Sequence, residues 1–178
     1  WATGVTVVQL NGGVSLNRRS GGAAGLAVTI AQRASGHVSL LPSPAILERV
    51  ETKQAIEADR TVAAVLVEAA EAQAFLFTAG PCDASSAHVE NGYLSASDVE
   101  ELARRGAVGD VLGRYIDADG NIVDPQLDAR TVGVDLGRLR AAKRSIFVTA
   151  GDAKHDIART VVTSGLCSVL VTDETTAP

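Results

Sequence analysis

Gly106-Ala-Val-Gly-Asp-Val-Leu-Gly-Arg-Tyr-Ile-Asp-Ala-Asp-Gly-Asn-Ile-Val123 is the stretch that decides the fold, because a helix end, an acidic residue and a strand start fall close together in it. Gly106 tolerates the left-handed conformation that ends many helices, so a helix is expected to stop there. The apolar run Val111–Ile116 predicts a strand, and Asp119-Gly120 predicts a turn that folds the chain back as a hairpin. Asp110 is then expected at the edge of a sheet, where its carboxylate is presented to a ligand.

Acidic residues before apolar runs predict where several helices begin. Ser97-Asp98-Val99-Glu100 has the spacing of a capping box, in which two side chains satisfy backbone N–H groups of the first turn. The pattern from Ala45 to Ala72 is helical and is expected to break at Asp59, which predicts an N-cap because its carboxylate accepts hydrogen bonds from free N–H groups. Asp135 and Asp152 predict N-caps of two later helices for the same reason.

Short β-branched runs alternate with these helical patterns along the chain. This alternation predicts an α/β fold with a doubly wound, mostly parallel, Rossmann-like sheet, to which the opening stretch adds a small β-hairpin. Ligands of such sheets bind beyond the carboxyl ends of the strands. The runs that predict strands are Val5–Leu10, His37–Leu41, Ala74–Ala79, Thr131–Val134, Ser145–Ala150 and Cys167–Thr172.

The composition limits the class of protein. The chain has 178 residues, of which 46% are apolar and 21% charged, and this suits one globular domain. The net charge of −5 disfavours nonspecific nucleic-acid binding, which needs a basic face. No apolar run approaches the roughly 20 residues of a membrane span. Cys82 and Cys167 lie far apart without metal spacing, as in a cytosolic protein. The chain has no Met and begins at Trp1, so a fragment is expected.

Two loops that follow predicted strands carry residues suited to an anion. Gly12 and Gly13 let the backbone turn sharply and bring N–H groups close to an anion, although tight turning alone is the other interpretation. Lys154 is expected in the first turn of a helix, where a positive charge is unfavourable unless an anion is bound. The sequence therefore favours a phosphate or carboxylate ligand for Lys154 as much as a plain surface position.

No pattern in the sequence predicts a metal, a cofactor or a catalytic group. Asp117-Ala-Asp119-Gly-Asn121 begins like a calcium loop, but Ile122 stands where that loop needs glycine, so a hairpin turn is predicted. No serine lies in a nucleophile elbow. Asp110 and Asp117 are an acid–base pair in one interpretation and turn or cap residues in the other. His88 lies in a long polar loop, and no partner is predicted for it.

From Val5 to Thr176 the chain resembles the sugar-binding effector domain of SorC/DeoR-type bacterial transcriptional regulators. Each matching piece is short, but the order and spacing of the pieces together are specific. The pieces that carry the resemblance are Val7-Val-Gln-Leu-Asn-Gly-Gly13, Leu41-Pro-Ser-Pro44, Gly92-Tyr-Leu-Ser95, Gly106-Ala-Val-Gly-Asp110, Ile116-Asp-Ala-Asp-Gly120, Ala150-Gly-Asp-Ala-Lys154 and Leu170-Val-Thr-Asp-Glu174.

The resemblance implies a function and partners. Such domains are similar in fold to sugar-phosphate isomerases, bind a phosphorylated sugar and thereby change the affinity of the regulator for its operator. The whole of 1–178 is then expected to be one effector domain, truncated at its N-terminus. DNA would be bound through a helix-turn-helix that is not in this chain. A cytoplasmic homo-oligomer, dimer or tetramer, is expected, with no membrane partner.

The resemblance also implies which residues contact the ligand. Glycine backbones and Lys154 would hold the phosphate, and Asp110 would accept hydrogen bonds from sugar hydroxyls. Ala79 departs from the family pattern, which often has a glycine there. The implied ligand-binding residues are Gly12, Gly13, Ser15, Ala79, Gly80, Asp110, Gly151 and Lys154.

Two other functions stay open at this stage. One is an enzyme of the same fold, a sugar-phosphate isomerase or a CoA-transferase-like protein, with Asp110 as a base or a glutamate as a nucleophile. No second catalytic group stands at a convincing position in the sequence. The other is a structural subunit that uses its sheet only for assembly.

Overall fold

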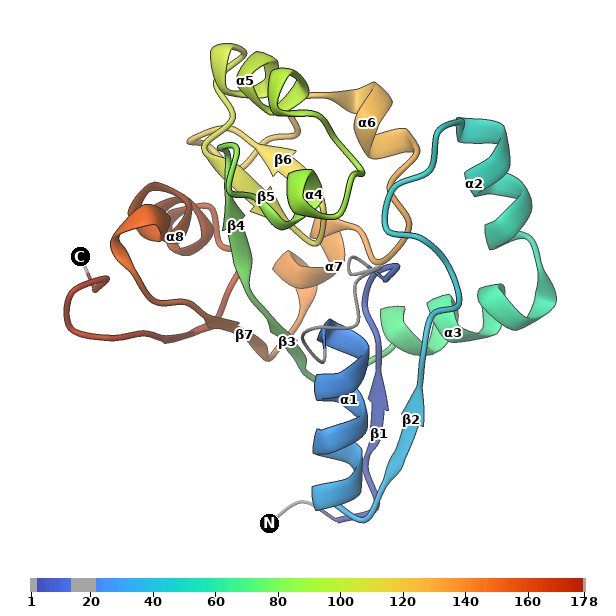
Figure 1. Ribbon diagram of the computed structural model, residues 1–178. Coiled ribbons are helices and arrows are strands. Elements are labelled where there is room, and N and C mark those ends of the chain that lie inside the picture. The colour runs from blue at the N-terminus through green and yellow to red at the C-terminus, as the bar shows by residue number, and fades with distance from the viewer. Residues whose placement is uncertain (1–2, 14–21, 178) are drawn as a thin grey trace. The chain divides into compact units, whose positions relative to one another are not determined.

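A computed structural model describes residues 3–13 and 22–177, and the contacts within it divide the chain into two compact units. The first unit holds residues 1–72 and 130–134, and the second holds residues 73–129 and 135–178. Figure 1 labels the helices and strands of both units. Ser15, a predicted ligand contact, lies outside the described residues.

The first unit pairs two parallel strands and surrounds them with helices. Thr6 lies opposite His37, and the register continues to Val8 and Ser39. Leu41, Val62 and Val132 form a buried cluster against which further aliphatic side chains pack. The elements of this unit are β1 (Thr6–Val8), α1 (Gly22–Arg33), β2 (His37–Ser39), α2 (Val50–Glu57) and α3 (Arg60–Ala70).

The helical pattern from Ala45 to Ala72 is confirmed only from Val50 onward. The residues before α2 are extended because backbone bridges hold them: Ile46 pairs with Thr131. The predicted break at Asp59 is confirmed, since the Asp59 carboxylate accepts hydrogen bonds from the first N–H groups of α3, at 2.8 Å from Thr61. A short side chain therefore sets the start of α3.

We expect Asp59→Ala to lower the free energy of unfolding by about 1 kcal/mol, because the first turn of α3 loses its cap. Denaturant unfolding followed by circular dichroism measures the change. Glu68→Ala, on an exposed position of the same helix, is the matched control and should change stability by less than about 0.5 kcal/mol. An equal loss in both variants would contradict the capping role.

The second unit contains a parallel sheet of order β3-β7-β8. One face of this sheet is buried and holds Phe77 and Phe147, whose rings stack at 5.3 Å between centroids. The elements of this unit are β3 (Phe75–Phe77), β4 (Ala79–Pro81), α4 (Ala87–Glu90), α5 (Ala96–Arg104), β5 (Gly109–Val111), β6 (Arg114–Ile116), α6 (Pro125–Ala129), α7 (Leu136–Ala141), β7 (Ser145–Val148), the 3-10 turn η1 (Asp152–Lys154), α8 (His155–Thr163) and β8 (Val169–Val171).

A second sheet in this unit, of antiparallel order β4-β5-β6, is followed by the predicted turn at Asp119-Gly120 and contains a further reversal that was not predicted. The prediction of one strand from Val111 to Ile116 is wrong, because Leu112 and Gly113 have φ of 55° and 83° and reverse the chain between β5 and β6. Two consecutive positive φ angles make the tight turn typical of β-hairpins. The turn at Asp119-Gly120 is also present, and it returns the chain so that Ile122 bridges Ile116.

The end of α5 and the start of α7 lie where they were predicted, whereas the capping box of α5 is displaced along the chain. The capping box of α5 is Ser95 with Asp98, so the box predicted two residues later is wrong. Ser95 has an extended backbone directly before the helix, whereas Ser97 is already helical. Gly106 follows the helix with φ of 95°, as predicted. Asp135 caps α7 by accepting a hydrogen bond from the Arg138 N–H, as predicted.

Asp117 is a turn residue. Its carboxylate accepts hydrogen bonds from the backbone N–H groups of Asn121 and Asp119, at 2.8 and 3.0 Å. The bond from Asn121 contributes most to holding the pKa of Asp117 below its usual value. Of the two interpretations of Asp117, the turn is therefore the one that the structure supports.

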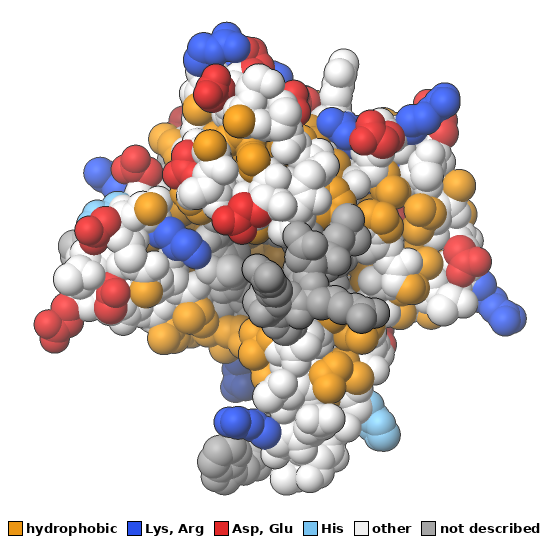
Figure 2. All heavy atoms as spheres, in the orientation of Figure 1, with side chains coloured by type: hydrophobic (Ala, Val, Ile, Leu, Met, Phe, Trp, Pro, Cys, Tyr) orange, Lys and Arg blue, Asp and Glu red, His pale blue; other side chains and the backbone are white. Residues whose placement is uncertain are grey.

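The predicted α/β class, with parallel strands, helices and a small hairpin, is confirmed by the structure. The expected third strand is divided, since Ala74–Ala79 becomes β3 and the start of β4, which pair with different neighbours. No described helix is both long and apolar enough to cross a membrane. On the face shown in Figure 2, the described Lys and Arg side chains are interspersed with Asp and Glu and form no single basic patch.

Candidate functional site

The carboxyl end of β7 leads into a helix whose first turn has no side-chain cap. Gly151 has φ of 103° and opens η1, and α8 then begins with Lys154 in the N-cap position. The prediction that Asp152 caps this helix is wrong, because the N-cap positions of η1 and α8 are Gly151 and Lys154, and neither side chain caps its helix. The Gly151 N–H itself donates to the Thr176 hydroxyl at 2.7 Å. Free N–H groups and the helix dipole favour an anion at such an end.

Polar groups without partners surround this helix start. The Lys154 side chain is partly exposed and makes no hydrogen bond or ion pair with the described residues. The hydroxyl of Thr149, only 4% exposed at the end of β7, has no hydrogen-bond partner among those residues. The Thr172 hydroxyl, after β8, is also buried and also has no hydrogen-bond partner among the described residues. Because a buried hydroxyl without a partner is costly, these groups are suited to a polar ligand.

Gly80 and Asp110 are directly paired neighbours in β4 and β5. Asp110 is 8% exposed, and its Oδ2 accepts a hydrogen bond from the Gly113 N–H at 3.0 Å. Its Oδ1 lies over the backbone of Gly80, where a Cβ atom would stand 2.3 Å away. Gly80 is therefore required to leave room for the Asp110 carboxylate.

The predicted site residues of the second unit gather around the edge strand β4. Within this unit β4 lies beside η1, so that Ala79 and Gly80 neighbour the segment that ends in Lys154. Helix α8 packs against the opposite face from Asp110, because a Cβ on Gly109 would stand 2.7 Å from the Ile157 side chain. A ligand that contacts both Lys154 and Asp110 must therefore cross the β4 edge at Gly80. Because residue 80 is a glycine, it presents no side chain of its own to that ligand.

Buried groups beside Asp110 remain protonated at neutral pH. Burial, helped by the charge of Asp110, raises the pKa of the Cys82 thiol to about 11. The same causes raise the pKa of the Tyr115 hydroxyl well above its usual value. Cys82 is thus a thiol and a poor nucleophile, since the thiolate is the reactive form.

The predicted glycine contacts of the first unit serve packing. The Gly12 N–H donates to the Val132 carbonyl at 3.2 Å, and the Gly13 N–H donates to the Ser43 carbonyl at 2.8 Å. A Cβ on Gly12 would stand 2.1 Å from the Pro44 carbonyl oxygen. Both amides are therefore occupied by backbone carbonyls, and a ligand contact at Gly12 and Gly13 stays a prediction.

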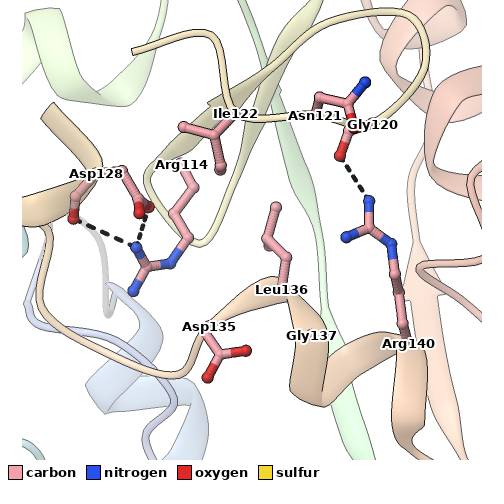
Figure 3. A pocket seen from close by; sticks show the side chains of 9 residues that line it. All are labelled: Arg114, Gly120, Asn121, Ile122, Asp128, Asp135, Leu136, Gly137 and Arg140. Carbon is pink, nitrogen blue, oxygen red and sulfur yellow. Dashed lines mark hydrogen bonds and ion pairs between the residues drawn. The ribbon is translucent and has the colours of Figure 1, made fainter. Parts of the chain in front are cut away.

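A separate pocket of about 320 Å³ lies on the other side of the hairpin. Arg114 lies opposite Val111, the residue after Asp110 in β5. Its side chain therefore projects from the other face of the sheet than Asp110, and there it pairs with Asp128. Arg140 donates to the Gly120 carbonyl at 2.6 Å, as Figure 3 shows. The lining residues are Arg114, Gly120, Asn121, Ile122, Asp128, Asp135, Leu136, Gly137 and Arg140.

This pocket is less suited to a phosphate than the α8 start. Its two arginines already have partners, and Asp128 and Asp135 balance their charge. No predicted ligand residue lines the pocket. We therefore interpret it as a polar junction that joins the hairpin to α7.

Sequence reasoning missed two residues at the site. His88 has partners that lie far away in the chain: its Nδ1 is 3.3 Å from the Tyr115 hydroxyl and 3.8 Å from Asp110 Oδ1. No local pattern predicts such contacts. Thr149 was within reach of prediction, because it lies at the carboxyl end of the predicted strand Ser145–Ala150, where ligand groups gather.

Comparisons with known proteins identify the family and the fold of the chain. The chain is 32% identical over 174 residues to the deoxyribonucleoside regulator of Bacillus subtilis, covering 98% of the chain and 55% of the relative. It matches the full-length sorbitol operon regulator SorC of Klebsiella pneumoniae with a TM-score of 0.88 at 22% identity, covering 99% of the chain and 58% of that protein.

A solved domain described as part of "a possible sugar-binding transcriptional regulator" from Arthrobacter aurescens matches at 29% identity and a TM-score of 0.78, covering 98% of the chain and 70% of the domain. The chain spans about half the length of the curated relatives it matches. The family model described as "Putative sugar-binding domain" matches residues 2–178. The chain therefore belongs to this family of sugar-binding domains, whose named relatives are DeoR- and SorC-type transcriptional regulators.

Proposed function

We propose that residues 1–178 are the effector-binding part of a bacterial transcriptional regulator and bind a phosphorylated sugar. Membership of the sugar-binding family supports a sugar ligand. Relatives named for deoxyribonucleoside and sorbitol regulation support an effector from carbohydrate or nucleoside metabolism. The arrangement at β4 and α8 supports an effector that carries both a phosphate and hydroxyl groups.

The observation that carries the proposal is the uncapped start of α8. Lys154 has no partner there among the described residues, and the buried Thr149 hydroxyl nearby in sequence also lacks one. A phosphate would satisfy these groups at once, because it accepts hydrogen bonds from an ammonium, a hydroxyl and helix N–H groups together. We assign the phosphate to the Lys154 ammonium and to the turn that Gly151 opens, where the Gly151 N–H itself donates to the Thr176 hydroxyl at 2.7 Å.

Asp110 is assigned to the sugar hydroxyls. Its Oδ2 is held by the Gly113 N–H, so the carboxylate has a fixed direction. Its Oδ1 lies over Gly80 in the edge strand β4, which neighbours η1. Only the backbone of Gly80 therefore separates this oxygen from the side of β4 on which η1 lies. A carboxylate accepts hydrogen bonds from hydroxyls and disfavours a nearby phosphate, so the ligand is oriented.

The other parts of the proposal concern the whole protein. The relatives named above are regulators, and this favours a ligand sensor over an enzyme of the same fold. The thiol form of Cys82 also gives no nucleophile beside Asp110. We propose that the chain is one effector domain, truncated at its N-terminus, of a cytoplasmic homo-oligomer that binds DNA through a helix-turn-helix outside these residues.

Thermal and denaturant unfolding with a panel of phosphorylated sugars tests the proposed function. The panel contains pentose 5-phosphates, hexose 6-phosphates and alditol phosphates, with each unphosphorylated sugar as the control. A ligand at a hundredfold excess over its dissociation constant is expected to stabilise the fold by about 2.7 kcal/mol. No stabilisation by any member, in this chain and in the full-length protein, would contradict the proposal.

A further inference from the structure

The loop between β4 and α5 places a buried imidazole against Asp110. His88, on the short helix α4, is 3% exposed. Its backbone carbonyl accepts hydrogen bonds from the N–H groups of Tyr93 and Leu94, at 2.9 and 3.2 Å. The imidazole contacts the ring of Tyr115 at 5.8 Å between centroids. The ring is therefore held by backbone bonds and by an aromatic neighbour.

Asp110, Tyr115 and Gly80 form one row on the face that His88 covers. Asp110 pairs with Gly80 on one side and with Tyr115 on the other, so their side-chain directions share a face of the β4-β5-β6 sheet. His88 Nδ1 lies 3.3 Å from the Tyr115 hydroxyl and 3.8 Å from Asp110 Oδ1. The second distance is longer than that of a direct hydrogen bond.

The two oxygens of Asp110 thus differ in their surroundings. Oδ2 has the Gly113 N–H, whereas Oδ1 lies between the bare backbone of Gly80 and the imidazole. A carboxylate 8% exposed needs favourable groups at both oxygens, because desolvating its charge is expensive. The Nδ1 of His88 is the ring nitrogen on the Oδ1 side, and it presents a donor there in the tautomer that carries its proton on Nδ1.

We propose that His88 is a positioning residue of the ligand site, which fixes the Asp110 carboxylate in the orientation that receives a sugar hydroxyl over Gly80. This inference rests on the proposed function. Lys154 lies on the other side of the β4 edge from Asp110 and His88. His88 therefore affects recognition of the sugar and does not affect recognition of the phosphate. His88 thereby contributes to the selection of the sugar by the arrangement of its hydroxyls.

Isothermal titration of two variants tests the inference. His88→Leu removes the donor, whereas His88→Asn keeps an N–H close to the position of Nδ1. The probes are the panel sugar phosphate that the wild type binds most tightly, and inorganic phosphate. His88→Leu is expected to weaken sugar-phosphate binding about tenfold or more while changing inorganic-phosphate binding less than about twofold. His88→Asn should restore the affinity to within about threefold of the wild type. His37→Leu, at an exposed histidine of β2, is the control.

Equal weakening of both probes, or no weakening of either, would overturn the positioning role. A measurement without ligand tests the contact between His88 and Asp110 directly. It keeps His88 in place, so it can be made even if His88→Leu does not fold. Long-range proton–nitrogen NMR spectra report the two ring nitrogens of His88, and Asp110→Asn is expected to shift the Nδ1 resonance. An unchanged Nδ1 resonance would overturn the contact. Failure of every panel sugar to bind the wild type contradicts the proposed function instead, and the NMR comparison tells the two failures apart.

Discussion

Lys154→Ala is expected to weaken binding of a phosphorylated sugar about ten- to a hundredfold, because a hydrogen bond to a charged group contributes about 1.5–3 kcal/mol. The free energy of unfolding should change by less than about 0.5 kcal/mol, since the partly exposed side chain has no partner among the described residues. Isothermal titration and denaturant unfolding of the same samples measure the two effects.

Lys143→Ala is the matched control for this prediction. Lys143 precedes β7 and Lys154 follows it, so the two lysines stand at opposite ends of one strand. The control should leave sugar-phosphate binding within about twofold of the wild type. If both variants lose affinity equally, the general charge of the surface explains binding and the assignment of Lys154 fails.

Gly80→Ala is expected to weaken sugar-phosphate binding about tenfold or more, an effect of about 1.4 kcal/mol, while sparing inorganic phosphate. The new Cβ would stand 2.3 Å from Asp110 Oδ1 and displace it. The carboxylate has little freedom to retreat, because the Gly113 N–H holds its other oxygen. Titration with both probes measures the loss.

A double-mutant cycle provides the control for Gly80. In an Asp110→Ala background the carboxylate is gone, so Gly80→Ala should cause little further loss of affinity. Additive losses would show that the methyl group acts through the backbone or directly on the ligand. In that case Gly80 is needed for close approach of the ligand rather than for the position of Asp110.

Local chemistry in the sequence predicted the starts of α3 and α7, but not those of α5 and α8. The carboxylates of Asp59 and Asp135 cap their helices as expected, because an N-cap needs only a short acceptor and the residues next to it. The β-hairpin was predicted in the right stretch, but its first turn was missed. Leu112 takes a positive φ of 55°, which leucine rarely adopts, so the apolar run gave no sign of a reversal.

The site was only partly predictable for a similar reason. Thr149 lies at the carboxyl end of the predicted strand Ser145–Ala150 and Lys154 follows that strand, so the general rule for ligands of α/β sheets applies to both. The surroundings of Asp110 depend on long-range pairing: Gly80 lies beside it in β4, and His88 reaches it from a loop. The spacing of these residues along the chain contains no such information.

Backbone NMR of this chain during titration with the tightest-binding panel sugar phosphate tests the central claim most directly. The account predicts that the largest shifts occur at Gly80, Asp110 and the residues from Gly151 to Lys154, on both sides of the β4 edge. Shifts centred instead on Arg114 and Arg140, with β4 and the start of α8 unchanged, would contradict it.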